Sequence, residues 1–119
     1  MIQITIGKHI YTVSPTIFPD GTIQVWRIDT SFFEKIKCAE VIEIIWCYGN
    51  DGELVQLMQV VDLIKANSTA KIYLHLPYLP YARQDKIISN ESCFGLNSFA
   101  KLINIMGFDL VTAFDPHRS

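Results

Sequence analysis

Residues 80–86 place five kinds of functional side chain within seven positions. They read PYARQDK, and their polar members are Arg83, Gln84, Asp85 and Lys86. A guanidinium offers a planar fork of donors that suits phosphate oxygens, and an ammonium adds a point charge. The run is what a nucleotide phosphate with a bound cation requires. A solvated, charge-rich loop fits the same spacing equally well.

A second group, Asp115 and His117, lies close to the end of the sequence. A carboxylate and an imidazole two positions apart can meet a divalent cation or its water shell. The alternative is that Asp115 caps a turn and His117 is a surface residue. If a metal binds here, magnesium is favoured over zinc, because no cysteine or second histidine has matching spacing.

The third group is the segment FPDGT at residues 18–22. Pro-Asp-Gly is a strong turn signal, so a simple turn explains most of the segment. It leaves Phe18 unexplained, since an aromatic side chain precedes an exposed turn. The sequence has no glycine-rich phosphate loop of either common type.

Composition narrows the class of protein. The 119 residues are 50% hydrophobic and 18% charged, which is typical of a single compact domain. A net charge of −2 gives no support for binding to nucleic acid or to an anionic membrane, and no apolar run is long enough to span one. Three cysteines without Cys-x-x-Cys spacing indicate a reducing, cytoplasmic compartment. By pattern, Cys38 and Cys47 are core thiols and Cys93 is exposed.

Alternating apolar residues at the start of the chain predict an antiparallel ribbon. Ile2, Ile4 and Ile6 alternate with polar residues, Gly7-Lys8 offers a two-residue turn, and the alternation resumes over residues 9–13. After a turn-bearing loop at 14–22, residues 23–28 continue the β pattern.

A different pattern follows, in which strands alternate with helices. Val41–Cys47 is nearly continuously apolar, as expected of a strand buried on both faces, and Ile72–Leu76 and Leu110–Phe114 predict two more strands. Asn50 with Glu53 predicts a capping box at a helix start. The apolar stripes that predict the two helices are Leu54, Leu57, Met58, Val61 and Ile64, and then Leu96, Phe99, Ala100 and Ile103, with Gly107 as the stop.

This order of elements predicts an α/β fold with a parallel βαβαβ core, right-handed crossovers and an amino-terminal antiparallel ribbon. In such sheets ligands bind beyond the carboxyl ends of the strands. Three segments lie at those ends: Tyr48–Asp51, Pro77–Cys93 and Asp115–Ser119. The second is too long for an ordinary connector, which favours a functional loop.

Taken together, these segments resemble the ribose-phosphate pyrophosphokinase (phosphoribosyl pyrophosphate synthetase) family. In that family a Pro-Tyr-Ala-Arg-Gln-Asp-Arg/Lys run precedes a loop and a helix, and a later strand ends in Asp-x-His. Upstream the family has a Phe-x-Asp-Gly-Glu turn, which Phe18, Asp20 and Gly21 match. The resemblance covers essentially the whole chain but only about the first half of a family member.

The resemblance implies a phosphoribosyltransferase-like fold and a reaction. The family transfers the diphosphoryl group of ATP to ribose 5-phosphate, giving phosphoribosyl pyrophosphate and AMP. Carried over by position, Arg83 and Gln84 contact ATP, and Asp85 and Lys86 shape the same loop. Asp115 and His117 hold Mg²⁺ and the polyphosphate.

The resemblance also implies a homo-oligomer, because the family builds its adenine site across an interface. Phe18 and Asp20 reach into a neighbouring subunit, with Thr22 at the position where the family usually has Glu. Ile87 and Ile88 replace charged loop residues.

The family's catalytic loop and its Asp-rich ribose-phosphate loop have no counterpart in residues 1–119. The chain therefore resembles the amino-terminal, ATP-side domain of a two-domain enzyme, is expected to be inactive alone, and contains no catalytic residue that we can assign. The alternative is a non-catalytic associated subunit of such an enzyme.

Overall fold

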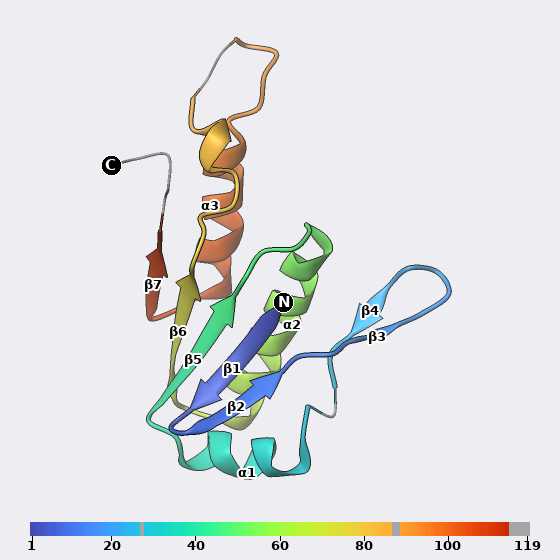
Figure 1. Cartoon of the computed structure of the whole chain (residues 1–119), viewed down its shortest axis with the longest axis vertical. Helices are drawn as coiled ribbons and strands as arrows, with labels where there is room; N and C mark the ends of the chain where they lie inside the picture. The colour runs from blue at the N-terminus through green and yellow to red at the C-terminus, as the bar shows by residue number, and fades with distance from the viewer. Residues whose placement is uncertain (27, 87–88, 115–119) are drawn as a thin grey trace.

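The computed structural model describes residues 1–26, 28–86 and 89–114. Its centre is a five-stranded sheet in the order β2-β1-β5-β6-β7 (Figure 1). Strands β5 (Val41–Trp46), β6 (Lys71–Leu76) and β7 (Leu110–Ala113) are parallel, as predicted. Strands β1 (Ile2–Ile6) and β2 (His9–Thr12) form the predicted antiparallel ribbon, and β1 joins it to β5.

The central strand β5 is buried on one face rather than on both. Ile42, Ile44 and Trp46 are fully buried, whereas the residues between them are only half-buried. In the register of the sheet, Ile44 lies between Ile4 of β1 and Leu74 of β6. The prediction of a strand covered on both sides was therefore wrong for the part of the chain that the structure describes.

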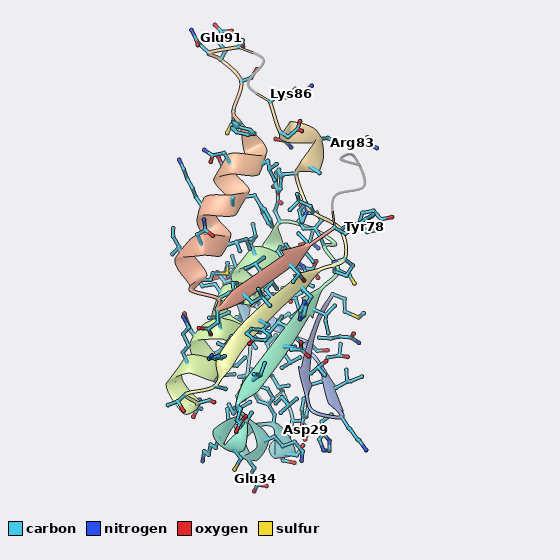
Figure 2. All side chains as sticks on the ribbon, turned by 90° about the vertical axis from the view of Figure 1, so that its left-hand side faces the viewer. Asp29, Glu34, Tyr78, Arg83, Lys86 and Glu91 are labelled. Atoms are coloured by element: carbon cyan, nitrogen blue, oxygen red, sulfur yellow. The ribbon has the colours of Figure 1, made fainter. Side chains whose placement is uncertain are left out.

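Helices α2 (Gly52–Asn67) and α3 (Gly95–Met106) lie on the same face of the sheet (Figure 2). Both predicted stripes are correct only in part. Met58 and Ala100 are exposed, while Val60 and Met106 are buried. Gly107 ends α3 with a φ of 75°, the left-handed conformation predicted for a helix stop.

Helix α1 (Thr30–Cys38) has no counterpart among the sequence predictions. The Asp29 carboxylate begins it by accepting a hydrogen bond from the Ser31 N–H at 2.8 Å. Phe32 and Ile36, one helical turn apart, are fully buried in the core beneath the sheet. An N-cap aspartate followed by this apolar pair is a helix signal that the sequence did contain.

The strand predicted over residues 23–28 is much shorter. Strands β3 (Thr16–Ile17) and β4 (Ile23–Gln24) form a separate two-stranded hairpin at the side of the molecule (Figure 1). The pairing stops at Val25 because its N–H donates instead to Gln59 Oε1 of α2, at 2.7 Å. Gln59 Nε2 donates to the Ile23 carbonyl at 3.1 Å, so one side chain fastens the hairpin to α2.

The cysteine prediction was wrong at two of the three positions. Cys38 ends α1 and Cys47 follows β5, and both are exposed rather than part of the core. Cys93 is exposed, as predicted.

Among the described residues, no helix combines the length and apolar character needed to cross a membrane.

Candidate functional site

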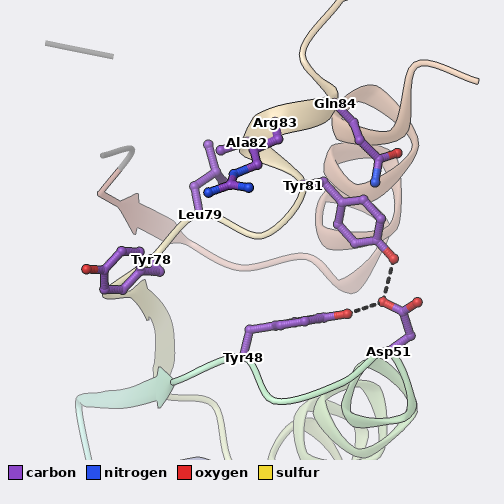
Figure 3. A pocket seen from close by; sticks show the side chains of 8 residues that line it. All are labelled: Tyr48, Asp51, Tyr78, Leu79, Tyr81, Ala82, Arg83 and Gln84. Atoms are coloured by element: carbon purple, nitrogen blue, oxygen red, sulfur yellow. Dashed lines mark hydrogen bonds between the residues drawn. The ribbon is translucent and has the colours of Figure 1, made fainter. Parts of the chain in front are cut away.

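The carboxyl ends of β5 and β6 open into a cavity of about 590 Å³, which we call the strand-end cavity (Figure 3). The segment after β5 and the loop after β6 form it together, at the sheet edge where parallel strands place their ligands. This confirms that two of the three predicted strand-end segments meet. The lining residues are Tyr48, Asp51, Tyr78, Leu79, Tyr81, Ala82, Arg83 and Gln84.

Arg83 and Gln84 are in this lining, within the strand-end segment Pro77–Cys93 that the sequence analysis identified. They belong to a short 3₁₀ turn, η1 (Ala82–Gln84), whose first residue is buried while the next two are exposed. In Figure 3 the Arg83 and Gln84 side chains leave the turn in different directions. The turn therefore presents a guanidinium and an amide at the mouth of the cavity.

Asp51 accepts hydrogen bonds from two tyrosines inside the cavity. The Tyr48 hydroxyl donates to Asp51 Oδ1 at 2.5 Å, and the Tyr81 hydroxyl donates to the same oxygen (Figure 3). The bond from Tyr48, followed by that from Tyr81, holds the pKa of Asp51 below its usual value. The same bonds to Asp51 raise the pKa of both phenols, so at neutral pH the acid is ionised and the tyrosines are neutral.

Tyr81 has a backbone conformation that is rare for its residue type. Its φ of 64° and ψ of 14° are left-handed, and among the described residues no other non-glycine residue has a positive φ. This conformation costs about 1–2 kcal/mol for a residue with a Cβ. Two contacts offset the cost: the bond to Asp51, and a stack of the ring on Phe99 with centroids 5.5 Å apart.

Gly95, the first residue of α3, sits against the Gln84 side chain. A Cβ built on Gly95 would lie 1.9 Å from Gln84 Oε1 and 3.1 Å from Gln84 Cβ. Any larger residue at position 95 would have to displace Gln84 from its place beside the cavity. This close approach explains why glycine occupies a buried position in the first turn of a helix.

Phe18, Asp20 and Thr22 lie elsewhere, in the loop of the β3–β4 hairpin. The Gly21 N–H donates to the Phe18 carbonyl and the Phe18 N–H to the Thr22 carbonyl, which closes a tight turn with Gly21 at a φ of 87°. Asp20 Oδ1 accepts from the Thr22 N–H at 2.9 Å and from its hydroxyl at 2.6 Å. Those two bonds, the hydroxyl's first, lower the pKa of Asp20.

A second hollow, of about 530 Å³, lies beside this hairpin. Phe18 is 42% exposed at its rim, so the aromatic that the turn signal left unexplained is available to a ligand or a partner. Figure 1 shows the hairpin well apart from the loop that joins β6 to α3. Within one chain, the structure therefore does not bring Phe18, Asp20 and Thr22 together with Arg83.

The other predicted site residues either lie outside the lining of the strand-end cavity or are not among the described residues. Asp85 is half-buried and Lys86 is exposed, and both follow η1 without lining the strand-end cavity. Asp115 and His117 lie outside the described residues, as do Ile87 and Ile88. Within residues 1–26, 28–86 and 89–114, no three carboxylate, imidazole or thiol side chains come close enough to hold a metal ion. The described residues therefore do not form a complete metal site by themselves.

Sequence reasoning missed four residues that shape these regions. Tyr48 and Asp51 were singled out only as parts of a strand-end segment, and Gly95 and Gln59 were not singled out at all. The position of residues 48–51 beyond a buried strand was a usable signal for the first pair. Gly95 and Gln59 act through contacts with distant segments, which no local pattern reveals.

Comparisons with known proteins agree on one family. Residues 1–107 match the family model described as the N-terminal domain of ribose phosphate pyrophosphokinase. A ribose-phosphate pyrophosphokinase of Haemophilus influenzae is 31% identical over 84% of this chain and 31% of its own length. Ribose-phosphate pyrophosphokinase 1 of Listeria monocytogenes is 30% identical over 98% of this chain and 34% of its own.

The fold has a counterpart among solved structures. The crystal structure of phosphoribosylpyrophosphate synthetase from Mycobacterium smegmatis superposes with a TM-score of 0.64 at 22% identity. The match covers 88% of this chain and 40% of that one. The chain spans about a third of the length of the curated relatives it matches.

Proposed function

Since this chain belongs to the family of N-terminal domains of ribose phosphate pyrophosphokinase, we propose that it supplies the ATP-binding part of such an enzyme. The reaction is transfer of the diphosphoryl group of ATP to ribose 5-phosphate, giving phosphoribosyl pyrophosphate and AMP. One observation carries the proposal: Arg83 and Gln84 line a cavity at the carboxyl ends of parallel strands. The alternative of an associated, non-catalytic subunit has no support in the names of the relatives quoted above.

In this proposal Arg83 is the main contact with the polyphosphate. Its planar fork matches phosphate oxygens, and transferring a phosphoryl group requires the developing charge to be neutralised and held in place. Gln84 adds neutral donors and an acceptor beside it, while Asp85 and Lys86 shape the loop that continues from η1. A volume of about 590 Å³ lies within the usual range for small-molecule sites.

The adenine end of the site is proposed to be shared between two copies of the chain. The β3–β4 hairpin lies apart from the loop that joins β6 to α3 in its own chain (Figure 1) and presents an exposed Phe18. Asp20 and Thr22 accompany it on a turn closed by its own hydrogen bonds. In a homo-oligomer, the hairpin of one copy would complete the cavity of the next.

Mg²⁺ is the proposed cation, with Asp115 and His117 as its protein contacts. A carboxylate and an imidazole with phosphate oxygens form a suitable donor set for a divalent cation. When bound, the ion would neutralise polyphosphate charge that otherwise resists attack on phosphorus. Arg83, from the neighbouring loop, would act on the same charge.

We further propose that residues 1–119 are one ATP-side domain of a two-domain enzyme and are inactive alone. Turnover would then require the ribose 5-phosphate site of the remaining two thirds of a family member. The check is AMP release from ATP, Mg²⁺ and ribose 5-phosphate by the 119-residue chain. We expect none above background, and substantial AMP formation would contradict this part of the proposal.

Calorimetric titration of the chain with ATP and Mg²⁺ tests the binding role. We expect saturable binding that Arg83→Ala weakens by about 1.5–3 kcal/mol, the usual contribution of a hydrogen bond to a charged group. Lys37→Ala is the matched control, because it removes an exposed cation from the last turn of α1. Equal affinities for the wild type and Arg83→Ala would remove Arg83 from the site.

The shared site has its own test, which mixes two defective chains. Phe18→Ala damages the part of each site that the hairpin supplies. Arg83→Ala damages the part that the strand-end cavity supplies. If two copies share a site, mixed oligomers contain intact sites and the mixture recovers ATP binding that neither variant has alone. Absence of recovery in oligomers shown to be mixed would place both halves within one chain.

A further inference from the structure

The Asp51 side chain does not perform the task that its position suggests. Asp51 occupies the N-cap of α2, where an aspartate ordinarily accepts a hydrogen bond from an N–H of its own helix. It makes no such bond here. Its carboxylate instead faces the strand-end cavity and accepts the hydroxyls of Tyr48 and Tyr81 (Figure 3). The contact with Tyr81 reaches a loop residue thirty positions away.

That contact falls on the residue that begins the turn carrying Arg83. The Gln84 N–H donates to the Tyr81 carbonyl at 2.9 Å, so the left-handed backbone of Tyr81 sets the direction in which η1 leaves the sheet. Two contacts hold the Tyr81 side chain: Phe99 stacks against the face of its ring, and Asp51 accepts a hydrogen bond from its hydroxyl. Without one of these contacts, the strained backbone is free to relax.

We propose that Asp51 is a positioning residue, which through Tyr81 keeps η1 oriented so that Arg83 and Gln84 face the strand-end cavity. The inference rests on the proposed function, in which Arg83 contacts the polyphosphate. Asp51 acts through Tyr81 and does not touch the ligand, because a carboxylate would repel phosphate. Tyr48 supplies the second donor and fixes the orientation of the carboxylate.

The bonds from Tyr48 and Tyr81 also bear on how the Asp51 carboxylate can lie in a cavity proposed to bind an anion. A bare carboxylate in the lining of the cavity would oppose the field of Arg83. Two phenol donors on Asp51 Oδ1 satisfy that oxygen with neutral groups. The arrangement allows a negative residue to serve a cavity proposed to bind phosphate.

A double-mutant cycle on MgATP affinity separates positioning from a general structural role. We expect Asp51→Ala to weaken MgATP binding about tenfold, on the scale of losing one hydrogen bond to a charged group. In the Arg83→Ala background, the same substitution should have little further effect, because the side chain it positions is gone. Full additivity of the two losses, or an unchanged affinity for Asp51→Ala, would overturn the inference.

Two further variants keep this test decisive. Tyr81→Phe retains the ring on Phe99 and removes only the hydroxyl, so it should reproduce the loss even if Asp51→Ala does not fold. Glu34→Ala is the control, since it removes an exposed carboxylate from α1 at the opposite end of the molecule from Arg83 (Figure 2). It should bind MgATP like the wild type.

A readout without ATP distinguishes failure of this inference from failure of the proposed function. NMR of the tyrosine Cζ carbons follows the ionisation of Tyr81, which the bond to Asp51 shifts above its ordinary range. Asp51→Ala should return it to that range and move the Arg83 and Gln84 amide signals. If the wild type binds no MgATP, the proposed function falls. If Tyr81 titrates normally in the wild type, or those signals stay in place, the positioning role falls.

Discussion

The β3–β4 hairpin is closed by hydrogen bonds between residues two to four positions apart, whereas the turn that carries Arg83 is held by a bond spanning thirty positions. Both regions belong to the proposed ATP site. Asp20 accepts hydrogen bonds from Thr22 in its own loop, whereas Asp51, at the start of α2, accepts one from Tyr81 in the loop after β6. The hairpin turn can therefore form from its local sequence, whereas the turn that carries Arg83 requires the sheet and α3 to be in place.

The largest effect expected from this difference is at Phe99, which is 3% exposed and stacks on Tyr81. Phe99→Ala should lower the free energy of unfolding by about 3–5 kcal/mol, the usual cost of emptying an aromatic core position. It should also release the Arg83 turn while leaving the hairpin unchanged. Urea denaturation measures the first effect and amide NMR shifts measure the second.

Leu102→Ala is the control for that prediction. Leu102 lies on the same helix and is 42% exposed, so its removal should change stability by no more than about 0.5 kcal/mol. Matching losses at the two positions, or hairpin shifts as large as those of the Arg83 turn, would contradict the separation of the two regions.

A smaller effect is expected in the hairpin, at Gly21. Its φ of 87° is left-handed, so Gly21→Ala should cost about 1–2 kcal/mol on thermal or urea unfolding. Gly21→Asn should cost less, since asparagine tolerates this region better. Here the strand-end cavity should remain intact by NMR. If Asn is as damaging as Ala, backbone conformation is not what closes the turn.

The smallest effect is expected on the free energy of unfolding at acidic pH. Hydrogen bonds hold the pKa values of Asp51 and Asp20 below the usual 3.8. Their stabilisation is present at neutral pH and is lost as the pH falls below about 3.8 towards the folded-state values. Asp51→Asn and Asp20→Asn should each flatten the fall in the free energy of unfolding below pH 4. Unchanged slopes in both variants would contradict the lowered pKa values.

The two regions also differ in how far the sequence predicted them. Pro-Asp-Gly located the hairpin turn because its determinants are neighbours in the chain. The parallel strands and the stop at Gly107 were predicted for the same reason, by local apolar pattern and a glycine C-cap. Arg83 and Gln84 were chosen as ATP contacts from their chemistry, and that role stays a prediction.

The sequence did not reveal the contacts between residues that are distant in the chain and meet only in the folded structure. Nothing near Tyr81 indicates that its hydroxyl will meet Asp51, or that Gly95 must be small because Gln84 lies against it. Helix α1 is a different case, since Asp29 with Phe32 and Ile36 was a readable signal that went unused. The shortened β4 follows from Gln59, which takes the N–H that a longer ladder would need.

The Gln59 contacts have a consequence for how the sequence of the hairpin loop can vary. Both of its hydrogen bonds reach main-chain groups of the hairpin, the Val25 N–H and the Ile23 carbonyl. These two hydrogen bonds therefore hold the hairpin through its main chain, beside the buried Val25 side chain. The side chain at a position such as Thr22 can therefore be replaced while the loop stays attached to α2. Ligand preference could drift at this loop independently of its anchorage.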